Sequence, residues 1–384
     1  MKKTLAFSFI AAAAFITLPA SAAEPISFNG GDLTFYGRLV AGVDYTTSLM
    51  DAGVQGHRTQ VASNQWGTSF LGLRYELPLR DGITAVGNLE SGFGSKDGTS
   101  NDGDSLFDRQ ANVGVKTPYG QVTIGNHMWI TNDSYAVDPM EHQWIGLNSV
   151  TNGRYWRNGN NTIAYRSPQW NGLQLGLMRM AGGTTGSDKR SSGNGAAVSY
   201  RGHGLDLLVV ADTVADRYGR YTGGANYGLG SQGSWNFAKG LLVGGAYEVG
   251  AFKLFAGYSE TKAKDATYGT FAAFDNKAKV TYAGLHYQAT SNLKLLSSAY
   301  RLTQPVSGKK ATLFALGMNY DWNKYLTTYA TVGQIDNNSI SDEAVSVNGA
   351  SNHALYYWDT ACRKDGNCNG VNSAGAYAGF VLKF

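Results

Sequence analysis

The sequence has few of the features that would divide it into domains or anchor it by helices. It has seven Pro and two Cys among 384 residues, and no linker, low-complexity block or composition break separates two parts. Beyond residue 22, no apolar run approaches the about 18 residues that a spanning helix needs, which excludes a helical membrane protein. The formal net charge is only +4, so the composition gives no reason to expect nucleic acid as a partner.

The motifs of common catalytic sites are also absent from the sequence. It contains no GxSxG nucleophile elbow, no HExxH zinc motif and no P-loop, and its six His residues are scattered without an i, i+4 pair. We therefore expect no enzyme activity, no cofactor and no metal site. A barrel hydrolase or protease is the enzymatic alternative, but it needs a polar catalytic cluster that these residues do not supply.

The two cysteines, Cys362 and Cys368, lie in a polar stretch with five residues between them. In an oxidising compartment such a pair can close a small loop disulfide, and free thiols are the alternative. No nearby His pattern makes the pair a metal site.

The N-terminal residues have the order of a secretory signal peptide. Lys2 and Lys3 precede a nearly continuous apolar segment at 5–18, and small residues follow at 20–22. We expect cleavage after Ala22, which leaves one domain at 23–384 and lowers the net charge to about +2. A transmembrane anchor is disfavoured, because the apolar run is short and ends in a cleavage site.

Apolar and polar residues alternate along most of the remaining chain. In the last nine residues, five apolar side chains fall on one face: Ala376, Ala378, Phe380, Leu382 and Phe384. A period of two indicates a strand with one face against an apolar environment. Sixteen such segments can be counted, joined alternately by short turns and long connections, with 50 Gly and 23 Tyr along the chain. This pattern predicts an all-β fold, a 16-stranded antiparallel transmembrane β-barrel, whose even strand number leaves no open edge.

The long connections are polar and lie between every second pair of predicted strands. They are expected at about 46–65, 94–104, 126–159, 182–193, 213–238, 261–277 and 336–375.

The predicted strand at 106–116 does not follow the simple pattern. Arg109 shares its parity with apolar residues such as Val113, whereas Gln110 and Asn112 lie on the opposite face. Either the apolar set faces the lumen and the polar set faces another subunit, or a bulge shifts the phase. Periodicity alone does not place Arg109.

The connection at 126–159 is the most informative one, since a loop of about 30 residues in a compact fold usually has a function. It carries apolar side chains that can pack on a surface, namely Trp129, Tyr135, Trp144 and Ile145. Folded into the barrel, it would present Asp133, Asp138 and Glu141 across the lumen. A solvated external loop is the alternative.

Alternation turns Arg38 and Arg74 inward, opposite these acids. A cationic wall facing an anionic loop makes a transverse field that orients dipolar solutes in a narrow, water-filled gap. The alternative is that the two arginines pair with Asp44 and Glu76 on neighbouring rungs.

Several different short motifs follow one another along nearly the whole mature chain. They are Leu-Thr-Phe-Tyr-Gly-Arg at 33–38, Gly-Leu-Arg-Tyr-Glu at 72–76, and further segments at 82–90, 107–111, 119–125, 157–163 and 165–168, with the terminal Phe384. In this order the chain resembles the general, non-specific porins of Gram-negative bacteria, in particular those of β-proteobacteria.

The resemblance implies a homotrimer of sixteen-stranded outer-membrane barrels, each with its third loop folded inside as the constriction. It implies passive diffusion of small hydrophilic solutes and ions, surroundings of outer-membrane lipid and lipopolysaccharide, and barrel-assembly machinery that reads Phe384. A substrate-preferring channel for an anionic metabolite or sugar is the alternative, with Trp129, Trp144 and Tyr135 as a stacking track.

The resemblance also implies a basic wall made of Arg38, Arg109 and Arg157, with Arg74 one rung away, facing Asp133, Asp138 and Glu141 of the third loop. With Arg109 facing the lumen, Gln110 and Asn112 would face outward. Phe70 stands where many members of the family have a second wall arginine, and the cysteine pair is not typical. Four arginines against three acids favour anions slightly.

Overall fold

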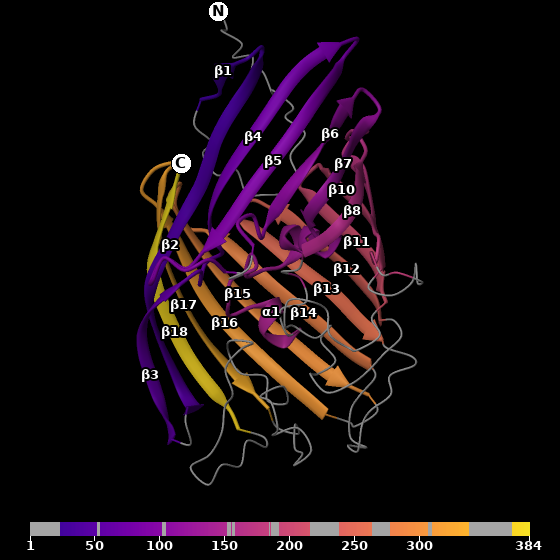
Figure 1. The fold of residues 1–384 in the computed structure, drawn as a ribbon. Helices are drawn as coiled ribbons and strands as arrows, with labels where there is room; N and C mark the ends of the chain where they lie inside the picture. The colour runs from indigo at the N-terminus through magenta and orange to yellow at the C-terminus, as the bar shows by residue number, and fades with distance from the viewer. Residues whose placement is uncertain are drawn as a thin grey trace, which may run out of the picture.

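The structure is a computed structural model that describes residues 24–51, 54–101, 105–151, 155, 158–183, 185, 192–215, 238–262, 277–305, 309–337 and 371–384. One antiparallel sheet contains all eighteen strands of the described residues (Figure 1). Their bounds are β1 (Ile26–Phe28), β2 (Gly31–Asp51), β3 (Val54–Ser63), β4 (Ser69–Arg80), β5 (Ile83–Phe93), β6 (Gln110–Thr117), β7 (Gly120–Met128), β8 (Asn158–Arg166), β9 (Leu173–Met180), β10 (Gly193–Gly202), β11 (Leu205–Val214), β12 (Ala238–Val249), β13 (Phe252–Lys262), β14 (Lys277–Gln288), β15 (Leu293–Gln304), β16 (Lys309–Asp321), β17 (Leu326–Asp336) and β18 (Ser373–Lys383).

The sheet closes into a barrel, because the last strand pairs with one of the first. β18 pairs with β2 from Gly375 opposite Thr46 to Lys383 opposite Arg38. β3 pairs with one half of β2 and β4 pairs with the other half, so β3 and β4 together count as one interrupted strand. β1 is a short strand that only pairs with the start of β2. Counted in this way, the barrel has sixteen strands, which confirms the predicted fold.

Side chains alternate between the two faces as predicted. In β2, Phe35 and Val43 are 49% and 52% exposed on the outer face, whereas Tyr36 and Asp44 are buried on the inner face. An apolar outer band and a polar interior are the arrangement that a membrane requires of a barrel. No helix among the described residues is long and apolar enough to cross a membrane.

The first predicted long connection is wrong in its bounds. Most of 46–65 is strand, because β2 runs to Asp51 and β3 begins at Val54. A register shift between Thr46 and Leu49 interrupts the alternation, which hides this hairpin from a period-two pattern.

The expected outward orientation of Gln110 and Asn112 is also wrong. The Gln110 side-chain amide donates to Glu90 Oε1 at 2.7 Å, and Asn88 Nδ2 donates to Asn112 Oδ1 at 3.0 Å, both inside the barrel. Arg109 also reaches Glu90, because it precedes the first residue of β6 and is not bound by the alternation of that strand.

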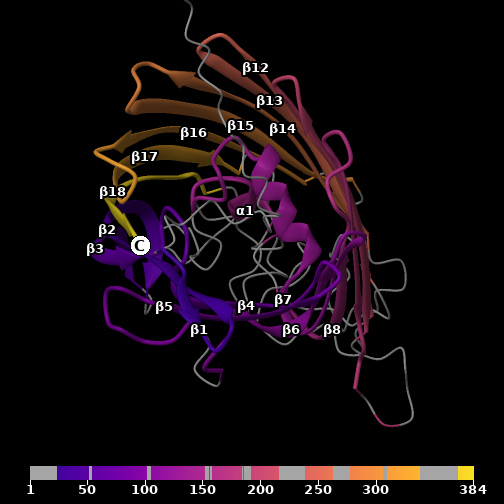
Figure 2. The ribbon, with the colours of Figure 1, turned by 90° about the horizontal axis from the view of Figure 1, so that it is seen from above.

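The described residues of the connection between β7 and β8 lie inside the barrel, as predicted (Figure 2). We call its described part, residues 129–151, the inner segment. It contains a 3-10 helix, η1 (Ile130–Val137), and a short helix, α1 (Leu147–Val150). η1 packs against β9 to β13, and α1 packs against β15.

Glycines on the inner wall make room for the inner segment. A Cβ added at any of four of them would lie within 2.6 Å of a segment side chain: Gly195 from Ile130, Gly244 from Val137, Gly284 from Pro139 and Gly333 from Ile145. Real Cβ atoms do not approach so closely, so only glycine fits at these positions. We call these four residues the glycine seat.

Candidate functional site

Hydrogen bonds to the strands fix the inner segment along one side of the wall. The Trp129 indole donates to Asp212 Oδ2 in β11 at 3.0 Å, and His286 Nε2 in β14 lies 2.7 Å from the Pro139 carbonyl oxygen. Further along the segment, Thr331 of β17 and Tyr377 of β18 donate to Gln143 Oε1, at 2.8 and 2.9 Å. The opposite wall, formed by β2 and β4 to β6, faces the segment across the lumen.

Asp133, the first of the three predicted loop acids, pairs with an arginine of the wall. Arg166 of β8 donates to both of its carboxylate oxygens, at 2.5 and 2.7 Å. The two side chains are 15% and 9% exposed, so the charges neutralise one another in a largely buried place.

Asp138, the second acid, is fully buried. Its carboxylate accepts hydrogen bonds from the Tyr300 hydroxyl at 2.5 Å and from the backbone amides of His142 and Met140, at 2.9 and 3.2 Å. Burial raises the pKa of Asp138 to about 6, although these hydrogen bonds act in the opposite direction. The carboxylate therefore points into the wall.

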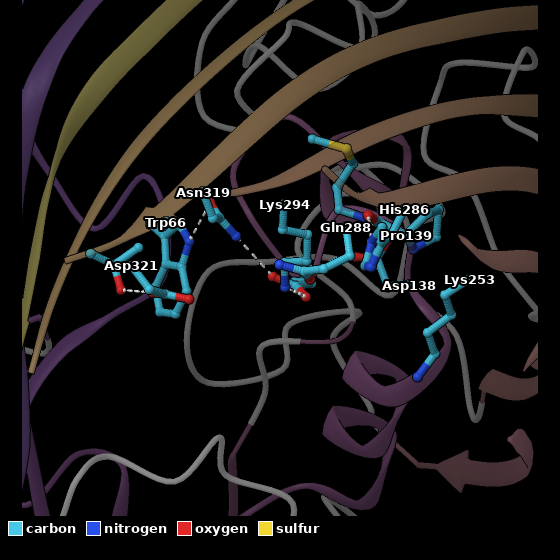
Figure 3. A network of polar contacts seen from close by, with 12 residues as sticks. Trp66, Asp138, Pro139, Lys253, His286, Gln288, Lys294, Asn319 and Asp321 are labelled. Carbon is cyan, nitrogen blue, oxygen red and sulfur yellow. Dashed lines mark hydrogen bonds and ion pairs between the residues drawn. The ribbon is translucent and has the colours of Figure 1, made fainter. Parts of the chain in front are cut away.

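Glu141, the third acid, forms an ion pair with Lys294 of β15 and accepts a hydrogen bond from Asn319 Nδ2 of β16 at 3.2 Å (Figure 3). Burial opposes its ionisation, but the charges of Lys294 and His286 outweigh burial and hold the pKa of Glu141 below its ordinary value. The structure thus brings all three acids inside the barrel, and each already has a partner on the wall.

Three of the four predicted wall arginines lie together on the inner face of β2, β4 and the start of β6. Arg109 Nε lies 3.0 Å from Glu90 Oε2, and Arg74 Nε donates to Asn88 Oδ1 at 3.2 Å. Arg38 Nε donates to the carbonyl oxygen of Thr68 at 2.7 Å.

The alternative in which Arg38 and Arg74 pair with Asp44 and Glu76 is not found in the structure, since both arginines have other partners. The fourth predicted arginine, Arg157, lies outside the described residues.

Aromatic rings separate the cations of this wall. The Arg74 guanidinium carbon lies 5.3 Å from the centre of the Tyr36 ring. The corresponding distances to the Phe70 ring are 4.6 Å for Arg109 and 5.4 Å for Arg38. Such distances allow cation–π attraction, which orients the cations without neutralising them.

The sequence did not single out two members of this wall, Trp66 and Lys383. The Arg38 guanidinium carbon and Lys383 Nζ lie 5.5 and 5.3 Å from the centre of the Trp66 ring. Alternation in the last strand placed Lys383 on the face opposite Phe384, which was the available signal. Trp66 lies between β3 and β4, outside any strand, so the alternation of strand residues could not predict where its side chain points.

The proposed stacking residues do not share one environment. Trp129 is 1% exposed and packs against the wall, whereas Tyr135 and Trp144 are half-buried. A cavity of about 420 Å³ lies between the inner segment and the wall and is lined by charged residues of both signs, among them Glu141, Lys253 and Lys294.

Phe384 continues the ladder beyond the last residue of β18. Its carbonyl oxygen accepts from Gly37 N at 2.9 Å, and its own amide donates to the Gly37 carbonyl oxygen at 3.2 Å. The segment predicted as a signal peptide, 1–22, and the cysteines Cys362 and Cys368 lie outside the described residues.

Comparisons with known proteins agree with this architecture. A family model described as Gram-negative porin matches residues 9–339. An outer membrane porin protein of Bordetella pertussis is 26% identical, over 90% of this chain and 97% of that protein.

Two solved structures are similar along their whole length. An anion-selective porin from Comamonas acidovorans has a TM-score of 0.72 at 19% identity, covering 92% of this chain and 100% of that one. The outer-membrane OmpT of Vibrio cholerae has a TM-score of 0.64 at 14% identity, covering 94% and 100%. At these identities the structural likeness concerns the fold.

Proposed function

The chain belongs to the Gram-negative porin family, and from this premise we propose that its channel favours anions through the arginines of its inner wall. As a porin it is an outer-membrane channel, not an enzyme, and small hydrophilic solutes pass through it by passive diffusion. The proposal concerns what sets the charge preference of the lumen between the inner segment and the facing wall.

The observation that carries this proposal is an imbalance between the two sides of the lumen. Two of the predicted acids on the inner segment pair with cations, Asp133 with Arg166 and Glu141 with Lys294. The third, Asp138, is fully buried against the Tyr300 hydroxyl, away from the lumen. On the facing wall, Arg38 bonds to a carbonyl oxygen and Arg74 to a neutral amide. Guanidinium groups stay charged at all relevant pH values, so this wall attracts anions.

Arg109 adds less to this field than Arg38 and Arg74, because Glu90 accepts from it. We propose Arg157 as a further member of the wall on the resemblance alone. The fold shared with an anion-selective porin is consistent with the proposal.

Planar-bilayer recordings in a KCl gradient test the proposed preference. We expect the reversal potential of Arg38→Ala, and more so of the Arg38→Ala/Arg74→Ala double variant, to shift toward cations. Arg301→Ala is a matched control, because Arg301 lies on the outer face of β15 and is exposed. A double variant that keeps the wild-type reversal potential would refute the role of these arginines.

The second candidate is a substrate-preferring channel for an anionic metabolite or sugar. It is favoured by the alternation of cations with aromatic rings along the wall, which offers stacking as well as charge. A saturable block of single-channel current by one solute would support it, whereas linear flux across many solutes supports the general pore.

We propose a homotrimer as the assembly. Exposed apolar side chains continue around the outer face from β3 to β8, and they could meet lipid or a second copy: Val61, Leu71, Val113, Ile124 and Ile163. Native mass spectrometry of the detergent-solubilised protein would show three chains, and a monomer mass would contradict the proposal.

We propose lipopolysaccharide as a neighbour of the other side of the barrel. Seven cations lie on the outward positions of β9 to β16 next to the long connections: Arg179, Lys239, Lys262, Lys277, Lys279, Arg301 and Lys310. Among the acids, Glu260 shares this band and pairs with Lys262 and Lys277. Clustered cations at a membrane surface attract anionic headgroups. Retention of lipopolysaccharide during purification, reduced when these cations are replaced by Gln, would test this.

A further inference from the structure

The residues between β3 and β4, 64–68, form a hydrogen-bonded turn that enters the barrel. Asn64 and Gly67 have φ values of 68° and 153°, and Ser69 N donates to Asn64 Oδ1 at 2.7 Å. The turn also joins the inner segment, since the Trp144 amide donates to the Gln65 carbonyl oxygen at 2.9 Å. Gln65 is fully buried and accepts from the Tyr329 hydroxyl at 2.7 Å.

This turn and the start of β4 surround the guanidinium of Arg38. Thr68 accepts its Nε–H, and the rings of Trp66 and Phe70 lie 5.5 and 5.4 Å from its central carbon. A Cβ added at Gly67 would lie only 2.7 Å from Arg38 Nη2. Residues 66–70 therefore fix where this cation lies, and they do so without an acid.

The same turn is tied to the inner segment through Trp66. The Trp66 indole donates to Asn319 Oδ1 at 3.0 Å, and Asn319 Nδ2 donates to Glu141 Oε2 at 3.2 Å (Figure 3). A continuous chain of contacts thus runs from Arg38 on the wall through Trp66 and Asn319 to Glu141 of the segment.

We propose that the turn at 64–68 is a second constriction element, which positions Arg38 and thereby sets the ion preference of the channel. Gly67 and Trp66 are positioning residues in this account. An arginine held by several contacts loses less entropy when it meets an anion than a free side chain does. The inference rests on the proposed function, because it assumes that Arg38 contributes to selectivity.

The experiment is a double-mutant cycle on Gly67 and Arg38, read as the reversal potential in a KCl gradient. Gly67→Ala adds a Cβ that collides with Arg38 Nη2 and strains the backbone, so we expect a shift toward cations that is smaller than that of Arg38→Ala. In the Arg38→Ala background the same substitution should add no further shift, because the residue it acts through is gone.

Gly98→Ala is the matched control. Gly98 also has a positive φ, of 74°, but an added Cβ there meets nothing within 4 Å, so its reversal potential should remain that of the wild type. Trp66→Phe and Trp66→Ala provide a second route if Gly67→Ala does not fold. The phenylalanine keeps a ring beside Arg38 and should preserve more of the selectivity than the alanine does.

Two results would overturn the proposal: equal shifts from Gly67→Ala with and without Arg38, or wild-type selectivity in both Gly67→Ala and Trp66→Ala. Neither result would contradict the proposed function as long as Arg38→Ala still shifts the reversal potential. If Arg38→Ala leaves the potential unchanged, the inference fails, whereas the proposed function fails only if the Arg38→Ala/Arg74→Ala double variant also keeps the wild-type potential.

Discussion

The guanidinium of Arg166 in β8 and the carboxylate of Asp133 in the inner segment form a two-pronged ion pair, with N–O distances of 2.5 and 2.7 Å. Both side chains are largely buried. The pair joins the first turn of η1, near the beginning of the inner segment, to β8 of the wall.

Arg166→Gln should loosen this end of the inner segment. It leaves the Asp133 carboxylate buried without its cation, and breaking such a pair from one side costs about 3–5 kcal/mol. We expect faster amide hydrogen exchange over 130–137 and a shift of the reversal potential toward cations. Arg201→Gln is the control, because Arg201 pairs with Asp206 but is 58% exposed, and an exposed pair contributes about 0–1 kcal/mol. Equal exchange in both variants would contradict this role for the pair.

Alternation was sufficient to predict the barrel and its strand number, whereas the inward position of the connection at 126–159 was predicted from its apolar side chains together with the family resemblance. Each strand of a barrel repeats the same physical requirement, apolar outside and polar inside, so the signal recurs along the chain. It failed where the backbone departs from period two: at the shift between Thr46 and Leu49, and at Arg109, which precedes its strand.

The pairings inside the lumen were beyond a sequence pattern. Alternation predicts which way the Arg74 side chain points. It does not predict that the partner is Asn88, instead of Glu76, because partners depend on the register between strands. The loop acids could be placed inside the barrel, but not paired: Arg166 is at the end of the next strand, β8, and Tyr300 and Lys294 come from β15, far away in sequence.

The glycine seat gives a prediction for channel width. Gly284→Ala would place a Cβ 2.3 Å from Pro139, so the inner segment must move away from the wall. We expect altered single-channel conductance with little loss of barrel assembly. Gly87→Ala is the control, since a Cβ there meets only the Asn112 carbonyl oxygen, at 4.0 Å. Identical conductance in the two variants would show that the seat does not position the segment.

Phe384 gives a prediction for assembly. Phe380 and Phe384 are both aromatic residues on the outward face of the last strand, 59% and 38% exposed, but only Phe384 is the proposed assembly signal. Phe384→Ala should lower the amount of heat-modifiable, folded barrel in outer membranes, and Phe380→Ala should lower it much less. Similar losses in both would mean that apolar surface matters and the terminal position does not.

Asp138 gives a prediction for pH dependence. Burial raises its folded pKa from 3.8 to about 6, so the folded state favours the protonated acid. The stabilisation is complete below the unfolded pKa of 3.8 and is lost as the pH rises from there through about 6. A pKa difference of about 2 corresponds to roughly 3 kcal/mol. Of the neighbouring groups, His142 acts in the opposite direction: burial lowers its pKa from 6.5 to about 3, so it binds a proton only in the opened state and its contribution to stability rises with pH up to about 6.5.

Asp138→Asn should remove this dependence, because the amide keeps an oxygen for the Tyr300 hydroxyl and cannot ionise. We expect the protection factors of the amides at 138–145 in the wild type, divided by those in the variant, to fall between about pH 4 and about pH 6, because the contribution of His142 is common to both proteins. Glu141 lies nearby, and Lys294 helps to hold its pKa below the ordinary value, so its contribution is likewise common to both proteins. A ratio that stays constant over this range would assign the pH response to another group and leave Asp138 as a hydrogen-bond acceptor only.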